Sequence, residues 1–85
     1  MKRVLPLPPF DTEYFSGRRE IEFGEEVRNL FSLIRELDAM APGFAETAQD
    51  RAGFAVDGTV HANWTDALPQ DCEVLIVPRV SGGTI

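Results

Sequence analysis

Residues 74–85 read VLIVPRVSGGTI. The first four of these residues form the most apolar run in the sequence and predict a buried strand that stops at Pro78. The Gly82-Gly83 pair that follows has no Cβ atoms, so its backbone can enter clefts too narrow for other residues. Small residues also collect at disordered chain ends. The pair by itself is therefore compatible with either a functional C-terminal segment or a disordered chain end.

Length and composition indicate one small globular domain. The chain has 85 residues, of which 44% are hydrophobic and 26% are charged. No apolar run approaches the roughly 20 residues of a membrane span, and Pro6, Pro8 and Pro9 interrupt the region where a signal peptide would carry its apolar core. Cys72 is the single cysteine, which excludes an internal disulfide and is compatible with a reducing cytoplasm.

The charge balance argues against nucleic acid as a partner. The net charge is −6, and the longest basic run, Arg18-Arg19, is followed at once by acidic residues. An acidic domain without a basic stripe repels phosphate backbones. The same charge suits a basic protein partner, and it also serves solubility without any partner.

The N-terminal part predicts a β-hairpin. Residues 4–10 favour an extended segment, and residues 11–17 favour a turn with Gly17 as its pivot. Residues 18–23 alternate polar and apolar side chains, which is typical of a strand with one buried face.

One amphipathic helix of about 15 residues follows the hairpin. Gly24 is expected at its N-cap, with Glu25 and Glu26 in the first turn, where the helix dipole favours acidic residues. Pro42-Gly43 closes the helical region. The apolar stripe, which is expected to face the core, consists of Val27, Leu30, Phe31, Ile34 and Leu37.

The second half predicts a short helical turn, three strands and a loop. Phe44 to Ala48 favours the helical turn, and Asp57-Gly58 predicts a hairpin between residues 54–56 and 59–62. Trp64, Ala67 and Leu68 lie in a loop that is expected to cover the core, and residues 73–77 form the last, central strand.

This order predicts an α+β fold of the β-grasp type, a mixed sheet of four to five strands with one main helix on one face. The expected boundaries are residues 1–80 for the domain and residues 81–85 for a C-terminal tail.

The inventory of reactive side chains argues against an autonomous enzyme. His61 has no second histidine or cysteine near it to share a metal. The acidic neighbours of Cys72 are expected to raise the pKa of its thiol, which disfavours a nucleophilic role. Glu25-Glu26 is explained by helix capping, and the glycines do not have the spacing of a phosphate loop.

Several motifs resemble the MoaD/ThiS family of ubiquitin-like sulfur carriers. They are VDGTV at residues 56–60, DAL at 66–68 and DCEVLIVPRVSGG at 71–83. Residues 27–44 are similar to the helix of that family and to the Pro-Gly-Phe at its end. The resemblance implies a β-grasp protein whose C-terminal carboxylate is the group that reacts.

For this chain the resemblance implies that Gly83 is adenylated and then converted to a thiocarboxylate. An adenylyltransferase similar to ubiquitin-activating enzymes would use ATP, and the carrier itself would bind no cofactor. A synthase would then accept the sulfur for molybdopterin or thiamine, or for another sulfur-containing metabolite. Because Thr84 and Ile85 follow the glycines, the chain resembles a precursor in which a metalloprotease must cut the Gly83–Thr84 bond.

The same resemblance implies a docking surface on the open face of the sheet. Two alternatives to the sulfur carrier remain: a ubiquitin-like modifier joined through Gly83 to lysine amines, and a non-covalent β-grasp binding subunit. The residues predicted to contact partners are Leu7, Val60, Val77, Arg79, Val80 and Ser81, of which Leu7, Val60, Val77 and Arg79 could equally be core or rim.

Overall fold

The last strand of the chain occupies the middle of a five-stranded sheet. The computed structural model describes residues 1–79. The strand order is β2-β1-β5-β3-β4. The elements are β1 (Lys2–Pro6), α1 (Phe10–Tyr14), β2 (Ile21–Phe23), α2 (Leu30–Met40), α3 (Phe44–Asp50), β3 (Ala52–Val56), β4 (Thr59–Val60) and β5 (Cys72–Pro78).

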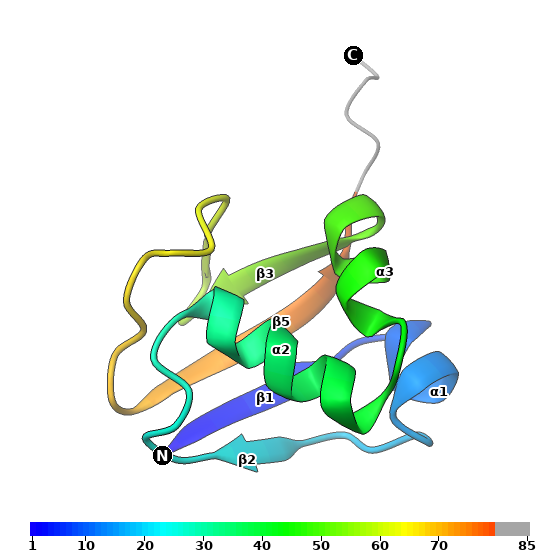
Figure 1. Ribbon diagram of the computed structural model, residues 1–85, viewed down its shortest axis with the longest axis horizontal. Coiled ribbons are helices and arrows are strands. Elements are labelled where there is room, and N and C mark those ends of the chain that lie inside the picture. The colour runs from blue at the N-terminus through cyan, green and yellow to red at the C-terminus, as the bar shows by residue number, and fades with distance from the viewer. Residues whose placement is uncertain (80–85) are drawn as a thin grey trace.

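The sheet is mixed, as predicted. β1 and β5 run parallel, with Val4 opposite Val74, and the other neighbouring strands run antiparallel. Parallel strands need a crossover, and the segment that holds α2 lies between β2 and β3 and covers one face of the sheet (Figure 1). The predictions of an N-terminal hairpin, a main helix and a central last strand are therefore confirmed.

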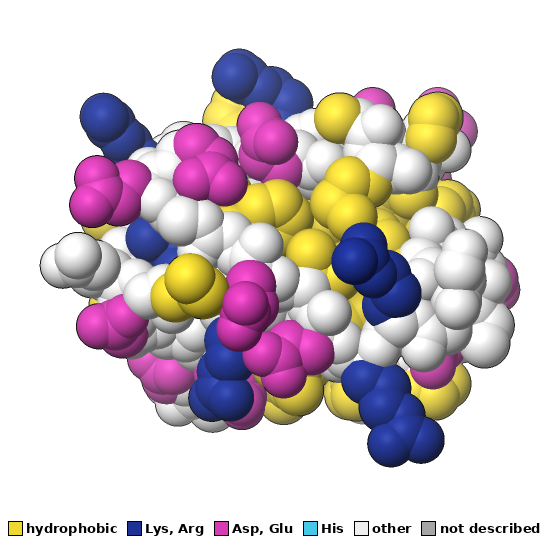
Figure 2. All heavy atoms as spheres, turned by 90° about the horizontal axis from the view of Figure 1, so that it is seen from below, with side chains coloured by type: hydrophobic (Ala, Val, Ile, Leu, Met, Phe, Trp, Pro, Cys, Tyr) yellow, Lys and Arg dark blue, Asp and Glu magenta, His cyan; other side chains and the backbone are white. Residues whose placement is uncertain are grey.

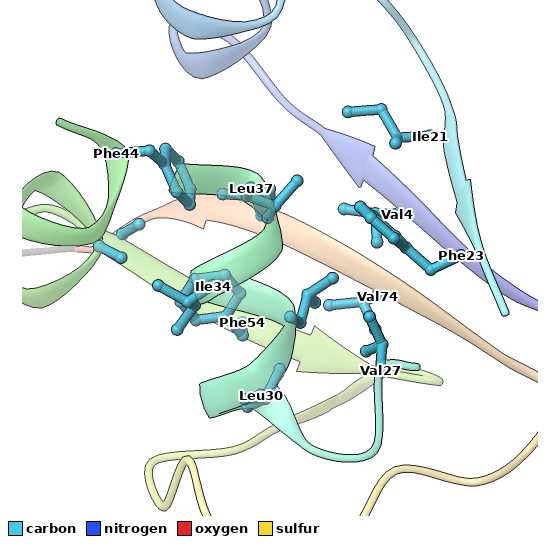
Figure 3. Close-up of a cluster of buried hydrophobic side chains, with 14 of the residues drawn as sticks. Val4, Ile21, Phe23, Val27, Leu30, Ile34, Leu37, Phe44, Phe54 and Val74 are labelled. Carbon is cyan, nitrogen blue, oxygen red and sulfur yellow. The ribbon is translucent and has the colours of Figure 1, made fainter. Parts of the chain in front are cut away.

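The core lies between α2 and one face of the sheet. Side chains of α2, such as Ile34 and Leu37, meet Val4, Phe54 and Val74 from three different strands (Figure 3). Phe44, at the start of α3, closes one end of this layer, and its ring packs edge-on against Phe15. Burial of this apolar layer provides most of the driving force for folding.

The start of the main helix differs from the prediction. α2 begins at Leu30, and its N-cap is Asn29, so Gly24 is not the cap. The Asn29 Oδ1 accepts from the Ser32 N–H at 2.8 Å, and the Ser32 Oγ accepts from the Asn29 N–H at 3.0 Å. This reciprocal capping box satisfies two N–H groups that the helix leaves free, whereas a glycine cap offers no side-chain acceptor. Glu25 and Glu26 consequently precede the helix.

The later start also rotates the buried stripe. Phe31, which the sequence predicts to face the core, is 56% exposed, and Leu33 is fully buried instead. Val27 is buried, as predicted, but from the loop before the helix. Because the predicted stripe treated Val27 as part of the helix, it placed one exposed residue on the buried face.

Three short elements also differ from their predictions. α1 starts at Phe10, the last residue of the predicted extended segment, and occupies the first half of the expected turn at residues 11–17. Its five residues are too few to show a helical period in the sequence. β2 starts at Ile21 and β4 stops at Val60, so both are shorter than predicted. Gly17 does adopt the left-handed conformation expected of a pivot, with φ +78°.

No helix within residues 1–79 has the length and apolar character needed to cross a membrane.

Candidate functional site

The sheet face opposite α2 carries a row of partly exposed apolar side chains. Side chains alternate along a strand, so the buried residues of β5, Val74 and Ile76, leave Leu75 and Val77 on the other face. In β1 the same alternation places Leu5 on that face. We call this side of the sheet the open face.

The strand register joins these residues into one surface. Leu75 lies opposite Leu5 on one side and Ala55 on the other, and Val60 lies opposite Ala55. Residues directly opposite in neighbouring strands share a face. The Leu7 N–H donates to the Ile76 carbonyl at 3.0 Å, which extends the β1–β5 ladder and brings Leu7 beside Val77. We define the open-face patch as Leu5, Leu7, Val60, Leu75 and Val77.

The predicted docking residues Leu7, Val60 and Val77 thus lie on one face, and Val60 is 71% exposed. Leu5 and Leu75 belong to the same surface but were not predicted. The alternation of β5 around Val74 and Ile76 was the signal that could have identified Leu75. The predicted residues Val80, Ser81, Gly82, Gly83 and Thr84 lie outside the described residues.

The open face becomes charged toward the other end of β5. Arg3 lies opposite both Glu22 and Glu73, and its Nη2 is 3.3 Å from the Glu73 Oε2. Beyond them, the N-terminal ammonium pairs with Asp71, and this pairing lowers the pKa of the Asp71 carboxyl. The apolar part of the face therefore lies at the end of β5 that leads into the C-terminal arm.

Arg79 holds that end of β5 through contacts within its own chain. Its guanidinium donates to the carbonyls of Gln49 at 2.9 Å, Ala52 at 2.9 Å and Ala48 at 3.3 Å. The sequence predicted a partner contact for Arg79 and gave no sign of this internal role, because the acceptors are backbone atoms 27–31 residues away.

A groove of about 380 Å³ lies next to Arg79, along the part of β3 that the short β4 leaves uncovered. Trp64 forms one wall, and its ring packs edge-on against Phe54. His61 also lines the groove, with its Nδ1 3.7 Å from an Asp66 carboxylate oxygen.

Cys72 lies away from the open face. Its side chain is buried among the core residues. Burial is the larger cause, and the nearby Asp57 carboxylate the next, of the raised pKa of its thiol. The predicted direction of the pKa shift is confirmed, although burial contributes more than the acidic neighbours. A protonated, buried thiol is a poor nucleophile. Among residues 1–79, no three His, Cys, Asp or Glu side chains come together as metal ligands.

Figure 2 shows the molecule from its β2 side, where acidic and basic side chains are interspersed around an exposed apolar area. No continuous basic stripe crosses the described part of this face. Phosphate backbones are bound by clustered lysine and arginine side chains, so this face does not suit them.

Two solved structures share this architecture. CysO of Mycobacterium tuberculosis, described as an antigen, superposes with a TM-score of 0.75 at 17% identity, over 94% of this chain and 100% of that chain. A Pyrococcus furiosus protein proposed to be subunit 1 of the molybdopterin converting factor superposes with a TM-score of 0.66 at 21% identity, over 93% of this chain and 97% of that chain.

The chain has the ubiquitin-like β-grasp fold. This is the fold that the resemblance to the MoaD/ThiS family implied. No protein-family profile and no curated protein matches the sequence. At these identities, the two superpositions establish the fold of the chain.

Proposed function

We propose that the chain is a sulfur-carrier protein, which acts as a substrate of other enzymes and not as an enzyme itself. Cleavage of the Gly83–Thr84 bond, by a metalloprotease in this proposal, exposes the carboxylate of Gly83. A partner adenylyltransferase joins this carboxylate to the α-phosphorus of ATP, which breaks the α–β phosphoanhydride bond and releases pyrophosphate. The AMP group now on the carboxyl is the leaving group that a carboxylate lacks. A sulfur donor then displaces AMP, and a synthase accepts the sulfur from the resulting thiocarboxylate.

The observation that carries the proposal is the path of β5. This strand lies in the centre of the sheet and ends at Pro78, and Val80-Ser81-Gly82-Gly83 follow one residue later in the sequence. A narrow glycine arm on a globular body suits a substrate that must enter a nucleotide site while the body docks outside. Binding energy from such remote docking can be used to orient the reacting group.

The open-face patch supports the same proposal. Its apolar side chains lie on the face next to the root of the arm, and a partner that held the arm would cover them. Exposed apolar surface of this kind marks interaction sites in soluble domains. The fold shared with the protein proposed to be a molybdopterin converting factor subunit favours an acceptor in molybdopterin-type synthesis. An acceptor in thiamine-type synthesis and a cytoplasmic location are parts of the proposal that rest on the family resemblance of the sequence alone.

The test combines processing with activation. The intact mass of the protein from its native cell is expected to show loss of the residues after Gly83 and exchange of one oxygen for sulfur. A chain that ends at Gly83 is expected to support ATP–pyrophosphate exchange by the adenylyltransferase of that cell. The matched controls are the chain that ends at Ile85 and the Gly83→Ala variant of the shortened chain, both of which should lose most of this activity. A native protein that always retains Thr84 would contradict the proposal.

A second candidate is a non-covalent binding subunit. Thr84 and Ile85 favour it, because a branched side chain after the glycines does not suit a narrow channel. In that case the open-face patch alone would bind the partner, and the native protein would retain both residues. Adducts on lysines of other proteins would instead identify a ubiquitin-like modifier.

A further inference from the structure

Arg79 joins the end of β5 to the end of α3 through four hydrogen bonds. Besides the three guanidinium contacts, its backbone N–H donates to the Arg51 carbonyl at 2.7 Å. Side chain and main chain of one residue therefore both bond to the segment 48–52. Arg79 is also the last residue that the structure describes before the arm.

Two of these acceptors, the carbonyls of Ala48 and Gln49, are groups that α3 cannot satisfy by itself. The last four carbonyls of a helix have no partner inside it, and a cation near them is favoured by the helix dipole. The last turn of α3 contains no basic residue of its own, so Arg79 supplies the cation from the end of β5. Its contacts to Ala48 and Gln49 match carbonyls that the helix leaves free, whereas the bond from its N–H to the Arg51 carbonyl continues the β3–β5 ladder.

The position of the bonds matters because a movement of residue 79 displaces the residues that follow it. Gly83 is four residues beyond Arg79, so even a fully extended arm places its carboxyl at most about 14 Å away. For a fully extended segment of that length, a rotation of about 20° at its base displaces its far end by about 5 Å. Reacting atoms must approach within about 3–3.5 Å, and a displacement of about 1 Å can cost a hundredfold in rate.

An arginine suits this task better than a lysine. The guanidinium is a planar fork with five N–H donors, so it can reach three carbonyls at fixed angles. A lysine ammonium keeps the charge near the helix end but acts as a point charge without this geometry. The structure therefore predicts that a lysine at this position restores the function of Arg79 only in part.

We infer that Arg79 is a positioning residue that fixes the point and the direction in which the C-terminal arm leaves the domain. The inference rests on the proposed function in one respect, that the arm is a substrate for activation. Arg79 acts on the reaction through the orientation of Gly83 and touches no reacting atom.

The first measurement uses the full chain and does not depend on activation. Amide hydrogen exchange at residue 79 is compared in the parent, Arg79→Met, Arg79→Lys and the control Arg35→Met, which removes an exposed charge from α2. Loss of the guanidinium contacts is expected to speed exchange at residue 79 about tenfold in Arg79→Met, with Arg79→Lys intermediate. Arg35→Met should match the parent, and circular dichroism shows whether each variant is folded.

The second measurement uses the chain that ends at Gly83, a truncation that removes no residue of the described domain. In activation by the adenylyltransferase, Arg79→Met is expected to lower kcat about tenfold to a hundredfold with little change in KM, because the open-face patch is intact. Arg79→Lys should recover part of kcat, and Arg35→Met should change neither constant.

The two measurements separate the inference from the proposed function. If the parent chain ending at Gly83 is not activated at all, the proposed function fails, and the anchoring role of Arg79 is decided by amide exchange. Unchanged exchange at residue 79 in Arg79→Met would overturn the inference. So would an active Arg79→Met chain whose kcat equals that of Arg35→Met.

Discussion

Substitution of Asn29 provides a sharp test of where the main helix begins. Three backbone N–H groups at this end are satisfied by side chains: Asn29 accepts from Ser32, and Ser32 accepts from Arg28 and Asn29. Asn29→Ala removes the first of these bonds, which is 2.8 Å long, and leaves the Ser32 N–H without that acceptor. Loss of an N-cap side chain of this type costs about 1 kcal/mol, and 1 kcal/mol lowers the Tm of a domain of this size by about 4–8 °C.

The matched control is Gly24→Ala, at the position that the sequence alone favoured as the cap. A Cβ there would meet only the flexible Glu26 carboxylate, at 3.0 Å, so the free energy of unfolding is expected to change by less than about 0.5 kcal/mol. Urea denaturation with a common m-value, followed by circular dichroism, measures both variants. The reasoning is refuted if Gly24→Ala costs more than Asn29→Ala, since the helix would then begin where the sequence pattern placed it.

Three further predictions concern the surface, the core and the buried thiol. Leu75→Arg is expected to weaken partner binding at least about tenfold while Phe31→Arg, on the exposed side of α2, does not; isothermal calorimetry with the adenylyltransferase would show equal losses if the open face were not the interface. Phe44→Ala should cost about 3–5 kcal/mol in urea denaturation, and a cost below about 1 kcal/mol would contradict its burial. Because the folded pKa of Cys72 is raised, its contribution to stability is present below the ordinary value of 9.0 and is lost as pH rises through the folded value. Thiol-specific labelling at pH 8 should accordingly be slow until the protein is unfolded.

The sequence predicted well those parts of the sheet in which the residue pattern of a strand matches its burial in the folded domain. The apolar run at Val74–Val77 is long and uniform because β5 is central, and Asp57-Gly58 adopts the positive φ angles that a tight hairpin requires. The alternation around Ile21 likewise marks a strand with one buried face. These signals are local and strong, so no tertiary information was needed to interpret them.

The positions that were predicted wrongly depend on contacts between residues far apart in the sequence, or on how a helix is rotated about its own axis. Phe31 and Leu33 are two residues apart on α2, and the rotation with which the helix packs on the sheet decides that Leu33 is buried and Phe31 is exposed. Arg79 bonds to carbonyls of α3 and β3, and backbone acceptors leave no trace in the side-chain pattern. For the same reason the open-face patch could be predicted only in part, since the strand register decides which residues lie side by side.

The central position of β5 has a consequence for the order of events in the cell. β1 and β2 form one half of the sheet, β3 and β4 form the other, and β5 is the strand that joins the halves. During synthesis, neither half can complete its core until residues 72–78 have left the ribosome. A chain that terminates before Cys72 lacks the central strand, so we expect that it does not form this fold and does not bind the partner. Each molecule that folds is then expected to contain the chain at least to the end of β5.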